Sequence, residues 1–357
     1  MIKKLILITL SALCVISRTK AQEIFFDGGV STFFDNTEYS GSGYGTARTI
    51  FAVEFDPTIG YRIDSHNTIC AGVQLLKDFG SDKFVDQPNF TAFYKFDNGT
   101  YGADAGIFSR SELVGRYSRA FYSDSTLIYN SSVQGVAMRY TGKQAFSELA
   151  VDWVGLYSAD TREQFRVLFA AGGSFARYFN AGVSLSVQHY ANKTTIEDNV
   201  VDNILANPYI EVSFTRVLDF TFRLGWLHSF QRDRQAHDGW KSPFGGEIYA
   251  RFAWKGIFVD NNLYAGKNLM PFRKTVGKDG LAYGSDLYTG DPFYATVRKI
   301  YNRTGLGYER SFLGDKISLR AEMVLQYAGA KVYTQQLLTL SARIAPVIYN
   351  HDKHNKH

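Results

Sequence analysis

Three residues in the segment 231–243 are of the types that can activate water. Asp233, His237 and Asp238 lie within six residues of one another. A carboxylate that orients a histidine makes it a general base, so this group is compatible with hydrolytic chemistry. The sequence offers no second acidic pair to complete such a site, and the spacing alone is weak support for an enzyme.

His228 and Ser229 form a second pair, in which the histidine would be the base and the serine the nucleophile. Neighbouring residues of a β-strand point to opposite faces, so these two side chains cannot cooperate on a regular strand. His351, His354 and His357 are best explained as parts of a solvated tail. We therefore predict that the protein is not an enzyme, has no catalytic residue, and binds neither a metal nor a cofactor.

The segments that carry these residues show the alternation of β-strands. In the segment 220–229 (FTFRLGWLHS), one face would carry four large apolar residues, namely Phe220, Phe222, Leu224 and Trp226. The other face carries Arg223 among small and polar neighbours, and a charged side chain there requires aqueous surroundings. Segments 51–60, 244–254 and 317–327 divide in the same way. Opposed faces of this kind suit a wall between lipid and water.

About sixteen such segments run from residue 22 to residue 349, joined by connections that are alternately short and long. The short connections lie near residues 64–67, 97–99, 141–144, 179–180, 218–219, 255–256 and 314–316. The longer ones lie near residues 35–47, 80–87, 109–130, 157–163, 191–207, 231–243 and 266–298, with a short one near 328–332. Outer-membrane barrels have strands of roughly 9 to 11 residues and short turns on the periplasmic side only, whereas a soluble sandwich has no reason for this succession.

The first residues predict export. Lys3 and Lys4 precede an apolar stretch at 5–17 that is too short to span a membrane, and a small-residue cleavage site follows at 19–21. We expect cleavage before Gln22 and residence in the cell outer membrane. The predicted division is a signal peptide at 1–21, the barrel at 22–349 and a short periplasmic tail at 350–357.

Charge and composition exclude two classes of protein. The formal net charge of +5 includes four basic residues of the signal region, and without them 35 basic residues face 34 acidic ones. A nearly neutral chain lacks the basic surface of a nucleic-acid-binding protein. No later stretch has the roughly 18 consecutive apolar residues of a transmembrane helix. Aromatic residues are abundant, with 23 Tyr and 28 Phe against 7 Pro, as in strands whose ends lie at membrane interfaces.

Closure of the sheet follows from its surroundings, because in hydrocarbon every backbone N–H and C=O must be paired within the protein. The first strand, from Ile24 to Phe34, must then pair with the last, near 333–349. That last strand ends on an aromatic and has one apolar face, formed by Leu338, Leu340, Ala342, Ile344 and Ile348.

In its last strand and in the alternation of short and long connections, the chain resembles bacterial outer-membrane porin-like β-barrel proteins. The resemblance implies an all-β fold, a transmembrane antiparallel up-and-down barrel of about 16 strands, and a terminal strand read by the barrel-assembly machinery. Pro346 inside the last strand and the tail beyond Tyr349 depart from that pattern.

A barrel of about sixteen strands is too wide to be filled by its own wall and normally encloses an aqueous channel. We therefore predict an outer-membrane channel for passive or weakly selective diffusion of small polar solutes. Inward charges of both signs favour broad passage, although many could pair to brace the wall. The expected pore-lining residues are Glu54, Asp56, Lys95, Asp104, Asp152, Arg166, Arg223, Glu247, Arg251, Arg320, Glu322 and Arg343.

The longest loop, 266–298, mixes large apolar residues with charges and glycines. Exposure of so many apolar groups is unfavourable, so they should pack on the inner wall, on neighbouring loops or on a ligand. We expect this loop to narrow the extracellular half of the pore. Its expected constriction residues are Lys267, Phe272, Arg273, Lys274, Tyr283, Tyr288 and Phe293.

Two alternatives to a channel remain open. One is a surface receptor or structural barrel that works with other envelope proteins, and the less favoured one is an outer-membrane hydrolase. The expected partners are outer-membrane lipid and lipopolysaccharide, the barrel-assembly machinery and small polar solutes, and no nucleic acid. The sequence does not fix the oligomeric state.

Overall fold

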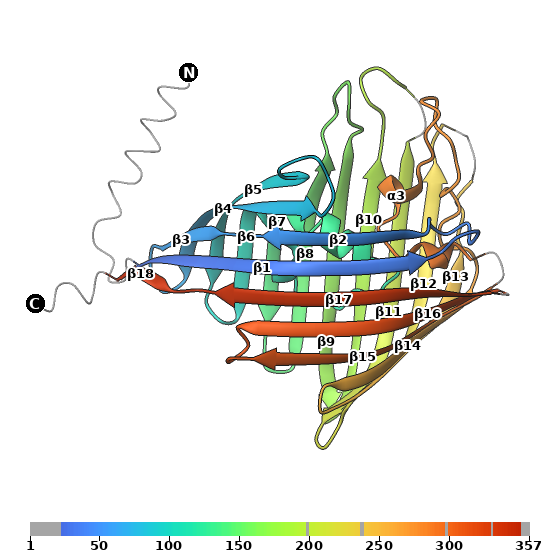
Figure 1. The fold of residues 1–357 in the computed structure, drawn as a ribbon. Helices are drawn as coiled ribbons and strands as arrows, with labels where there is room; N and C mark the ends of the chain where they lie inside the picture. Colours follow the sequence, from blue (N-terminus) through green and yellow to red (C-terminus); the bar gives the residue numbers. More distant parts are fainter. Residues whose placement is uncertain (1–22, 198–199, 236–238, 297–298, 330, 351–357) are drawn as a thin grey trace, which may run out of the picture.

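The computed structural model describes residues 23–197, 200–235, 239–296, 299–329 and 331–350, and most of them lie in strands that are antiparallel neighbours around the molecule (Figure 1). The strands are β1 (Glu23–Glu38), β2 (Arg48–Phe55), β3 (Thr58–Arg62), β4 (Asn67–Asp78), β5 (Gln87–Asp97), β6 (Tyr101–Ser109), β7 (Ser132–Thr141), β8 (Ala145–Gly155), β9 (Gln164–Ala176), β10 (Phe179–Tyr190), β11 (Val201–Thr215), β12 (Asp219–Asp233), β13 (Phe244–Trp254), β14 (Ile257–Gly266), β15 (Ile300–Phe312), β16 (Ile317–Ala328), β17 (Lys331–Ile344) and β18 (Val347–Asn350). Short helices lie in two loops: η1 (Arg110–Glu112), α2 (Asp124–Tyr129), α3 (Gly284–Leu287) and η2 (Pro292–Ala295). The predicted signal peptide and all but Asn350 of the predicted tail fall outside the described residues.

The sheet closes on itself. β1 pairs with β17 and β18 on one side and with β2 and β3 on the other. The register between the first and last strands runs from Gly28 opposite Ile344 to Glu38 opposite Thr334. β2 with β3, and β17 with β18, are halves of one strand, so the 18 strands of the described sheet make a closed antiparallel barrel of 16. The predicted fold class and the predicted pairing of first and last strands are confirmed.

Both interruptions fall at a proline beside β1. Pro57 separates β2 from β3, and Pro346 separates β17 from β18. Proline has no N–H to donate to the ladder, so a regular strand is broken there. The Asp56 N–H still donates to the Gly29 carbonyl at 3.1 Å, and the Phe26 N–H donates to the Pro346 carbonyl at 3.0 Å. The two breaks therefore flank the same few residues of β1.

The connections alternate in length as predicted. The short turns, at one end, are residues 63–66, 98–100, 142–144, 177–178, 216–218, 255–256 and 313–316. The other end carries residues 39–47, 79–86, 110–131, 156–163, 191–200, 234–243 and 267–299, with a two-residue connection at 329–330. β1 begins at the short-turn end, where Glu23 pairs with Arg62, and outer-membrane barrels place such turns in the periplasm.

Several strand boundaries differ from the prediction, and β10 and β11 are two examples. β10 begins at Phe179, where a turn was expected, and β11 begins at Val201, inside the loop expected at 191–207. In both places cross-strand pairing continues through polar residues, Asn180 and Asp202, which in the sequence look like turn formers. Tertiary pairing outweighs local propensity at these positions.

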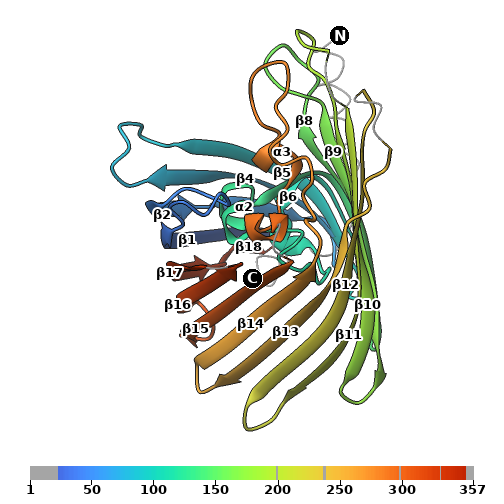
Figure 2. The same cartoon turned by 90° about the vertical axis from the view of Figure 1, so that its right-hand side faces the viewer.

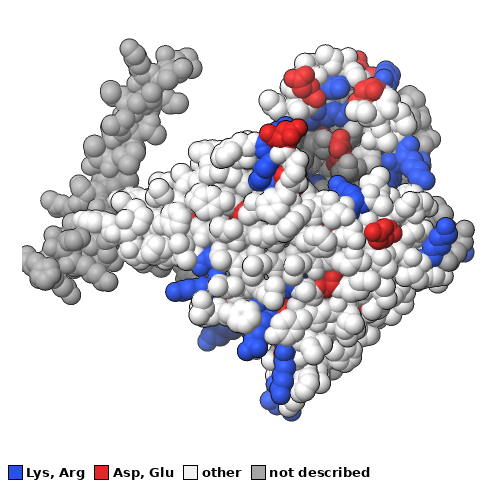
Figure 3. All heavy atoms as spheres, in the orientation of Figure 1, with Lys and Arg blue, Asp and Glu red and all other residues white. Residues whose placement is uncertain are grey.

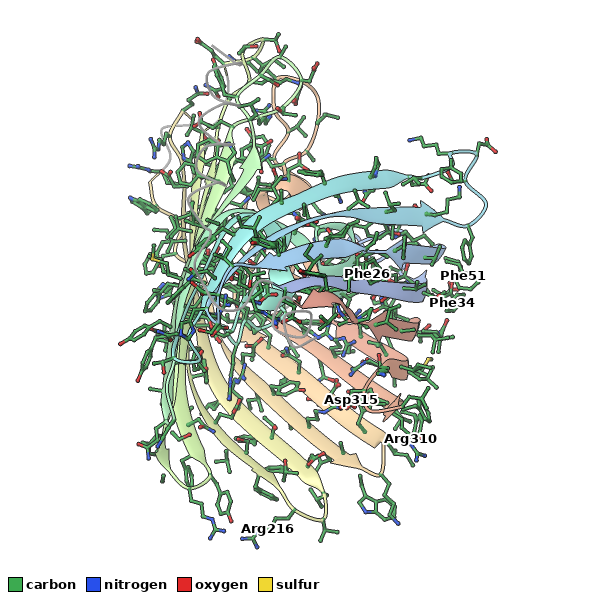
Figure 4. The ribbon with its side chains drawn as sticks, turned by 90° about the vertical axis from the view of Figure 1, so that its left-hand side faces the viewer. Phe26, Phe34, Phe51, Arg216, Arg310 and Asp315 are labelled. Carbon is green, nitrogen blue, oxygen red and sulfur yellow. The ribbon has the colours of Figure 1, made fainter. Side chains whose placement is uncertain are left out.

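Alternate side chains of each strand face the lipid or the lumen. Phe222, Leu224 and Trp226, at every second position of β12, are all exposed on the outer wall. Phe34 and Phe51 lie on the same outer side of neighbouring strands, with ring centroids 6.0 Å apart (Figure 4). Much of the face drawn in Figure 3 is free of charged side chains, which gather mainly toward its margins. Among the described residues, no helix is long and apolar enough to cross a membrane.

Gly106 in β6 should not tolerate a side chain. Its φ is +128°, and a Cβ there would lie 2.2 Å from the Ala92 carbonyl oxygen of β5. We expect Gly106→Ala to destabilise the barrel by about 1–3 kcal/mol through backbone strain and crowding. The measurement is the temperature at which the detergent-solubilised barrel loses its compact gel mobility. Gly246→Ala is the control, because a Cβ there meets open space; equal temperatures for both variants would contradict the prediction.

Candidate functional site

Two extracellular loops fold back into the barrel and meet inside it. Segment 110–131, with η1 and α2, comes from between β6 and β7, and segment 267–296, with α3 and η2, follows β14. The Ser123 N–H donates to the Thr289 carbonyl at 2.8 Å and joins the two segments. Figure 2 shows α2 and α3 surrounded by strands. The two segments together are called the plug.

Aromatic packing anchors the plug to the wall. Phe293 is fully buried, its ring stacks on Tyr301 of β15 at a centroid distance of 5.4 Å, and it meets Tyr39 edge-on at 5.1 Å. The same buried cluster contains three other residues expected at a constriction, namely Phe272, Tyr283 and Tyr288. Packing on wall and plug accounts for the apolar content of this long loop.

The three cations expected at the constriction lie in different surroundings. The Arg273 guanidinium donates to the Tyr44 carbonyl at 2.6 Å and is tied to another loop. Lys274 is exposed. The Lys267 ammonium lies 4.8 Å from the ring centre of Phe244, whose side chain is on the outer wall.

Charged residues lock the plug to β15. Asp124 Oδ2 accepts a hydrogen bond from Arg119 at 2.6 Å and lies 3.6 Å from Arg303 Nη2. Burial by itself would raise the pKa of the Asp124 carboxyl, but the two guanidiniums outweigh it and lower that pKa to about 2. The Asp291 N–H donates to the Arg119 carbonyl at 2.8 Å, so Arg119 joins both parts of the plug. Arg119, Asp124 and Arg303 are together called the lock.

Arg303 is also the centre of a charge network on the inner wall. It is 1% exposed and donates to Glu322 at 2.8 Å and to Asp260 at 3.2 Å. Arg320 donates to Glu322 at 2.7 Å, and Arg251 donates to Asp260 at 3.4 Å. Opposite charges alternate across neighbouring strands, so the network is largely self-neutralising.

The other residues expected to line a pore each have a partner in the wall or the plug. These contacts are Glu54 with Gln74, Asp56 with the Gly29 N–H, Lys95 with Glu112, Asp104 with Arg139, Asp152 with Arg110, Arg166 with Gln188, Arg223 with Glu211, Glu247 with Tyr294, and Arg343 with Asp27. Much of their charge is therefore used to hold wall and plug together.

Cavities remain on both sides of the plug. One of about 250 Å³, toward the extracellular side, is lined by Asp35 and Arg48 among others. Another of about 500 Å³, toward the periplasmic side, is lined by Arg116 and Arg223 among others. Asp124 lines both, so α2 stands between them. A third cavity, of about 550 Å³, lies beside β3, β4 and β5, with Lys95 and Glu112 among its lining residues.

On the outer wall, polar side chains occur near the extracellular ends of four neighbouring strands. The outward residues of β12, read from the periplasmic end, are Phe220, Phe222, Leu224, Trp226, His228, Phe230 and Arg232, so one aromatic residue follows His228 toward the extracellular end. The first polar outward residues of β10, β11 and β13 are, respectively, His189, Asp202 and Ser242, the last just before its strand begins. Roughly 9 to 11 strand residues cross a bilayer, and His228 is the tenth of β12. His228 therefore lies near the extracellular boundary of the hydrocarbon, and Asp202, which is opposite Arg232, lies farther toward the extracellular side. His189, Asp202, His228 and Ser242 are together called the polar row.

His228 and Ser242 form a hydrogen bond within the polar row. The distance from His228 Nε2 to Ser242 Oγ is 2.6 Å. The His228 ring stacks on Phe230 at a centroid distance of 4.1 Å and meets Phe244 edge-on at 5.7 Å, so its orientation is fixed by packing. A serine hydroxyl that contacts an imidazole nitrogen can lose its proton to that nitrogen when it attacks a carbonyl.

The other polar residues of the row form an ion-pair group. Asp202 accepts two hydrogen bonds from Arg234, each at 2.7 Å, and one from Arg232 at 3.2 Å. His189 Nδ1 lies 3.4 Å from the same carboxylate. The negative charge of Asp202 is thus neutralised by neighbouring arginine side chains.

The sequence did not indicate the pair of His228 with Ser242. Ser229 is fully buried and faces inward, as expected from its place next to His228. Ser242 reaches His228 because the ladder continues past β13, through pairing of Gln231 with Lys241. Extension of the register between β12 and β13 into the loop 234–243 would have predicted this contact.

The acid and histidine group of the segment 231–243 is only partly described. His237 and Asp238 lie outside the described residues, and Asp233 is buried on the inner face of β12. Within the described ranges, no cluster of three or more His, Cys, Asp or Glu side chains could hold a metal ion.

A family model described as "Lipid A 3'-O-deacylase-type" matches residues 16–343, which is nearly the whole barrel. Because the description names an enzyme, the prediction that the protein is not an enzyme is wrong. That prediction weighed groups close together in the sequence, whereas strand register brings together residues such as His228 and Ser242 from the two sides of a loop. A search of curated proteins found no match.

Solved outer-membrane proteins share the fold at low sequence identity. OprD from Pseudomonas aeruginosa is 9% identical, with a TM-score of 0.53, and the match covers 90% of this chain and 94% of that one. OccK11 (OpdR) from the same organism is 8% identical, with a TM-score of 0.53 and coverage of 92% and 98%. A loop L8 deletion mutant of OmpT from Vibrio cholerae is 10% identical, with a TM-score of 0.55 and coverage of 91% and 100%. These likenesses confirm the predicted porin-like barrel.

Proposed function

Because the chain belongs to the lipid A 3'-O-deacylase-type family, we propose that it is an outer-membrane hydrolase that removes an ester-linked acyl chain from lipid A. The observation that carries the proposal is the contact of His228 with Ser242 on the outer wall, near the extracellular ends of β12 and β13. The ester bonds of lipid A lie at this depth, because they join the acyl chains to the sugar headgroup. Lipid of the outer leaflet can reach the row by lateral diffusion.

The lumen is a less suitable place for this reaction. An acyl chain would have to leave the hydrocarbon for a polar interior, which is unfavourable by about 0.8 kcal/mol for each CH₂ group. The plug already occupies much of that interior, and its residues Arg119 and Asp124 are paired with each other. The outer wall requires no such transfer of lipid.

Expression of the full chain in a Gram-negative host without this activity tests the proposal. We expect the protein in the outer-membrane fraction, and we expect the extracted lipid A to lose the mass of one acyl chain in mass spectrometry. The same host with an empty vector supplies the baseline. Lipid A of unchanged mass, in cells that contain the folded barrel, would contradict this function.

Passage of small polar solutes is a second candidate function. It is favoured by the polar cavities on both sides of α2, which share Asp124 as a lining residue. Displacement of α2 would join these cavities into a path through the barrel. Ion current through purified barrels in planar bilayers tests this second function independently of lipid chemistry.

A further inference from the structure

We propose that the periplasmic end of the barrel, from β9 to β15, binds anionic phospholipids of the periplasmic leaflet of the outer membrane. The inference does not rest on the proposed function, because it concerns the end of the wall opposite to the polar row. Three exposed cations lie in successive short turns, at 177–178, 216–218 and 255–256, and a fourth lies near the periplasmic end of β15. These four residues are called the basic arc, namely Arg177, Arg216, Lys255 and Arg310.

The charge of the basic arc is not neutralised within the protein. None of its four cations forms an ion pair with a carboxylate of the described residues. The exposed carboxylates nearby are few: Asp219 begins β12, Asp315 lies in the turn 313–316, and Glu309 is paired with two arginines of neighbouring strands. The turns 63–66 and 98–100 contain no Lys or Arg. Positive charge is therefore concentrated on one side of the periplasmic end, and Lys and Arg side chains stand out along the lower margin of Figure 3.

The first two cations lie against an aromatic ring of the outer wall. The guanidinium carbons of Arg177 and Arg216 are 5.1 and 5.7 Å from the ring centre of Tyr178. Arg216 also donates to the Tyr178 hydroxyl at 2.5 Å, and its side chain extends from the tip of its turn (Figure 4). Tyr178 meets the ring of Phe214 at a centroid distance of 5.9 Å, and Phe214 meets Phe220 at 5.1 Å. These rings form part of an aromatic belt on the lipid side.

The other two cations have the same kind of support. The Lys255 ammonium is 4.8 Å from the ring centre of Trp254, and the Arg310 guanidinium carbon is 5.4 Å from that of Phe312. Both rings are exposed. Arg310 occupies every second position of β15 together with the exposed residues Leu306 and Phe312, so its side chain starts from the lipid-facing side of the wall.

This combination suits phosphate groups at a membrane interface. Tyr and Trp rings are typical of the depth at which headgroups begin, and a Lys or Arg beside them places its charge among those headgroups. Adjacent hairpins of the wall are roughly 10 Å apart, so the cations form a row along the leaflet rather than one point. A guanidinium binds phosphate through paired hydrogen bonds.

The charge of the row favours one class of phospholipid. A zwitterionic headgroup such as phosphocholine brings a cation of its own, which the basic arc repels, whereas phosphatidylglycerol brings only negative charge. The cations rest on rings of the outer wall instead of projecting freely into the periplasm. This placement favours a lipid partner over a soluble acidic protein.

Quenching of tryptophan fluorescence by brominated phospholipids tests the inference on the full-length barrel in vesicles. Trp254 lies beside the basic arc, so a variant in which it is the only tryptophan reports the lipid bound there; its substitutions are Trp153→Phe, Trp226→Phe and Trp240→Phe. The vesicles contain equal amounts of phosphatidylglycerol and phosphatidylcholine, with one of the two brominated at a time. We expect the relative affinity at Trp254 to favour phosphatidylglycerol at least about threefold at low salt. The preference should fall toward one in about 1 M NaCl, because the screening length is then about 3 Å.

Two controls show whether the preference belongs to the basic arc. A variant that keeps only Trp153, an exposed residue near the extracellular end of β8, should show no such preference. The arc variant, in which all four cations of the basic arc are replaced by Gln, should lose the preference at Trp254. A control variant that makes the same charge change at exposed extracellular residues should keep it; its substitutions are Lys83→Gln, Lys274→Gln, Lys278→Gln and Lys331→Gln. Compact gel mobility of every variant reports folding.

Equal quenching of Trp254 by the two brominated lipids would overturn the inference. A preference that the arc variant retains, or that Trp153 shares, would overturn it as well. Equal quenching together with binding of soluble polyglutamate, lost in the arc variant only, would assign the basic arc to an acidic protein instead. Lipid A deacylation enters none of these measurements, so failure of the proposed function and failure of this inference are distinguishable.

Discussion

Replacement of Arg303 by methionine should lower the free energy of unfolding of the barrel by about 3 kcal/mol or more. The guanidinium is 1% exposed and lies between Glu322, Asp260 and the plug residue Asp124. Methionine keeps much of the volume but leaves buried carboxylates without their shared cation. Removal of one partner from a buried ion pair is strongly unfavourable because the remaining charge is poorly solvated.

Urea-induced unfolding in detergent, followed by tryptophan fluorescence, measures this loss. Arg310→Met on the same strand is the control, because Arg310 is exposed near the periplasmic turn and should be nearly neutral. The double variant Arg303→Met with Glu322→Met should recover part of the stability, since it removes a buried charge along with its partner. Equal stability of Arg303→Met and Arg310→Met would show that the network does not hold the wall together.

Asp124→Arg should raise the single-channel conductance of the barrel several-fold. The substitution places a third guanidinium beside Arg119 and Arg303, so attraction that holds α2 becomes repulsion. Release of α2 would join the cavities that it separates. Planar-bilayer recordings measure the effect, and Asp160→Arg in an exposed extracellular loop makes the same charge change without touching the lock. Equal conductance of these two variants would mean that α2 does not close the path.

The lock should also respond to acid in a defined direction. The pKa of Asp124 is about 2 in the plugged barrel, below its ordinary value of 3.8, so ionised Asp124 favours the plugged state. That contribution is complete above about pH 4 and is lost as the pH falls toward 2. Wild-type conductance should rise over this interval, whereas Asp124→Asn should lack this component because its side chain carries no charge at any pH. An identical acid response of the two proteins would assign the change to other groups.

The barrel could be predicted because its determinants are local. Alternation at every second residue, short turns and an apolar last strand can each be read within one segment, and closure then follows from the pairing requirement. The plug could not be predicted in the same way, because Ser123 and Thr289 are in contact but belong to loops that are far apart in the sequence. A long apolar loop showed that packing must occur, but it did not show that a second loop supplies part of the partner surface.

The candidate catalytic pair illustrates a different limit. His228 drew attention in the sequence, yet the adjacent Ser229 faces the lumen. The useful partner, Ser242, depends on how far pairing continues past β13, and a shift of one residue would turn its side chain to the other face. Strand identity can be predicted from composition, whereas register at a strand end depends on the folded neighbours.

The two prolines beside β1 have a consequence for the order in which the barrel closes. Pro57 and Pro346 remove ladder donors on both sides of the first strand, near its periplasmic end, while the register with β17 is continuous from Gly28 to Glu38. The seam between the first and last strands therefore has fewer ladder hydrogen bonds at its periplasmic end than along the rest of its length. We expect newly inserted chains to join the first and last strands from the extracellular side downward, and the periplasmic end of this seam to be where thermal opening begins.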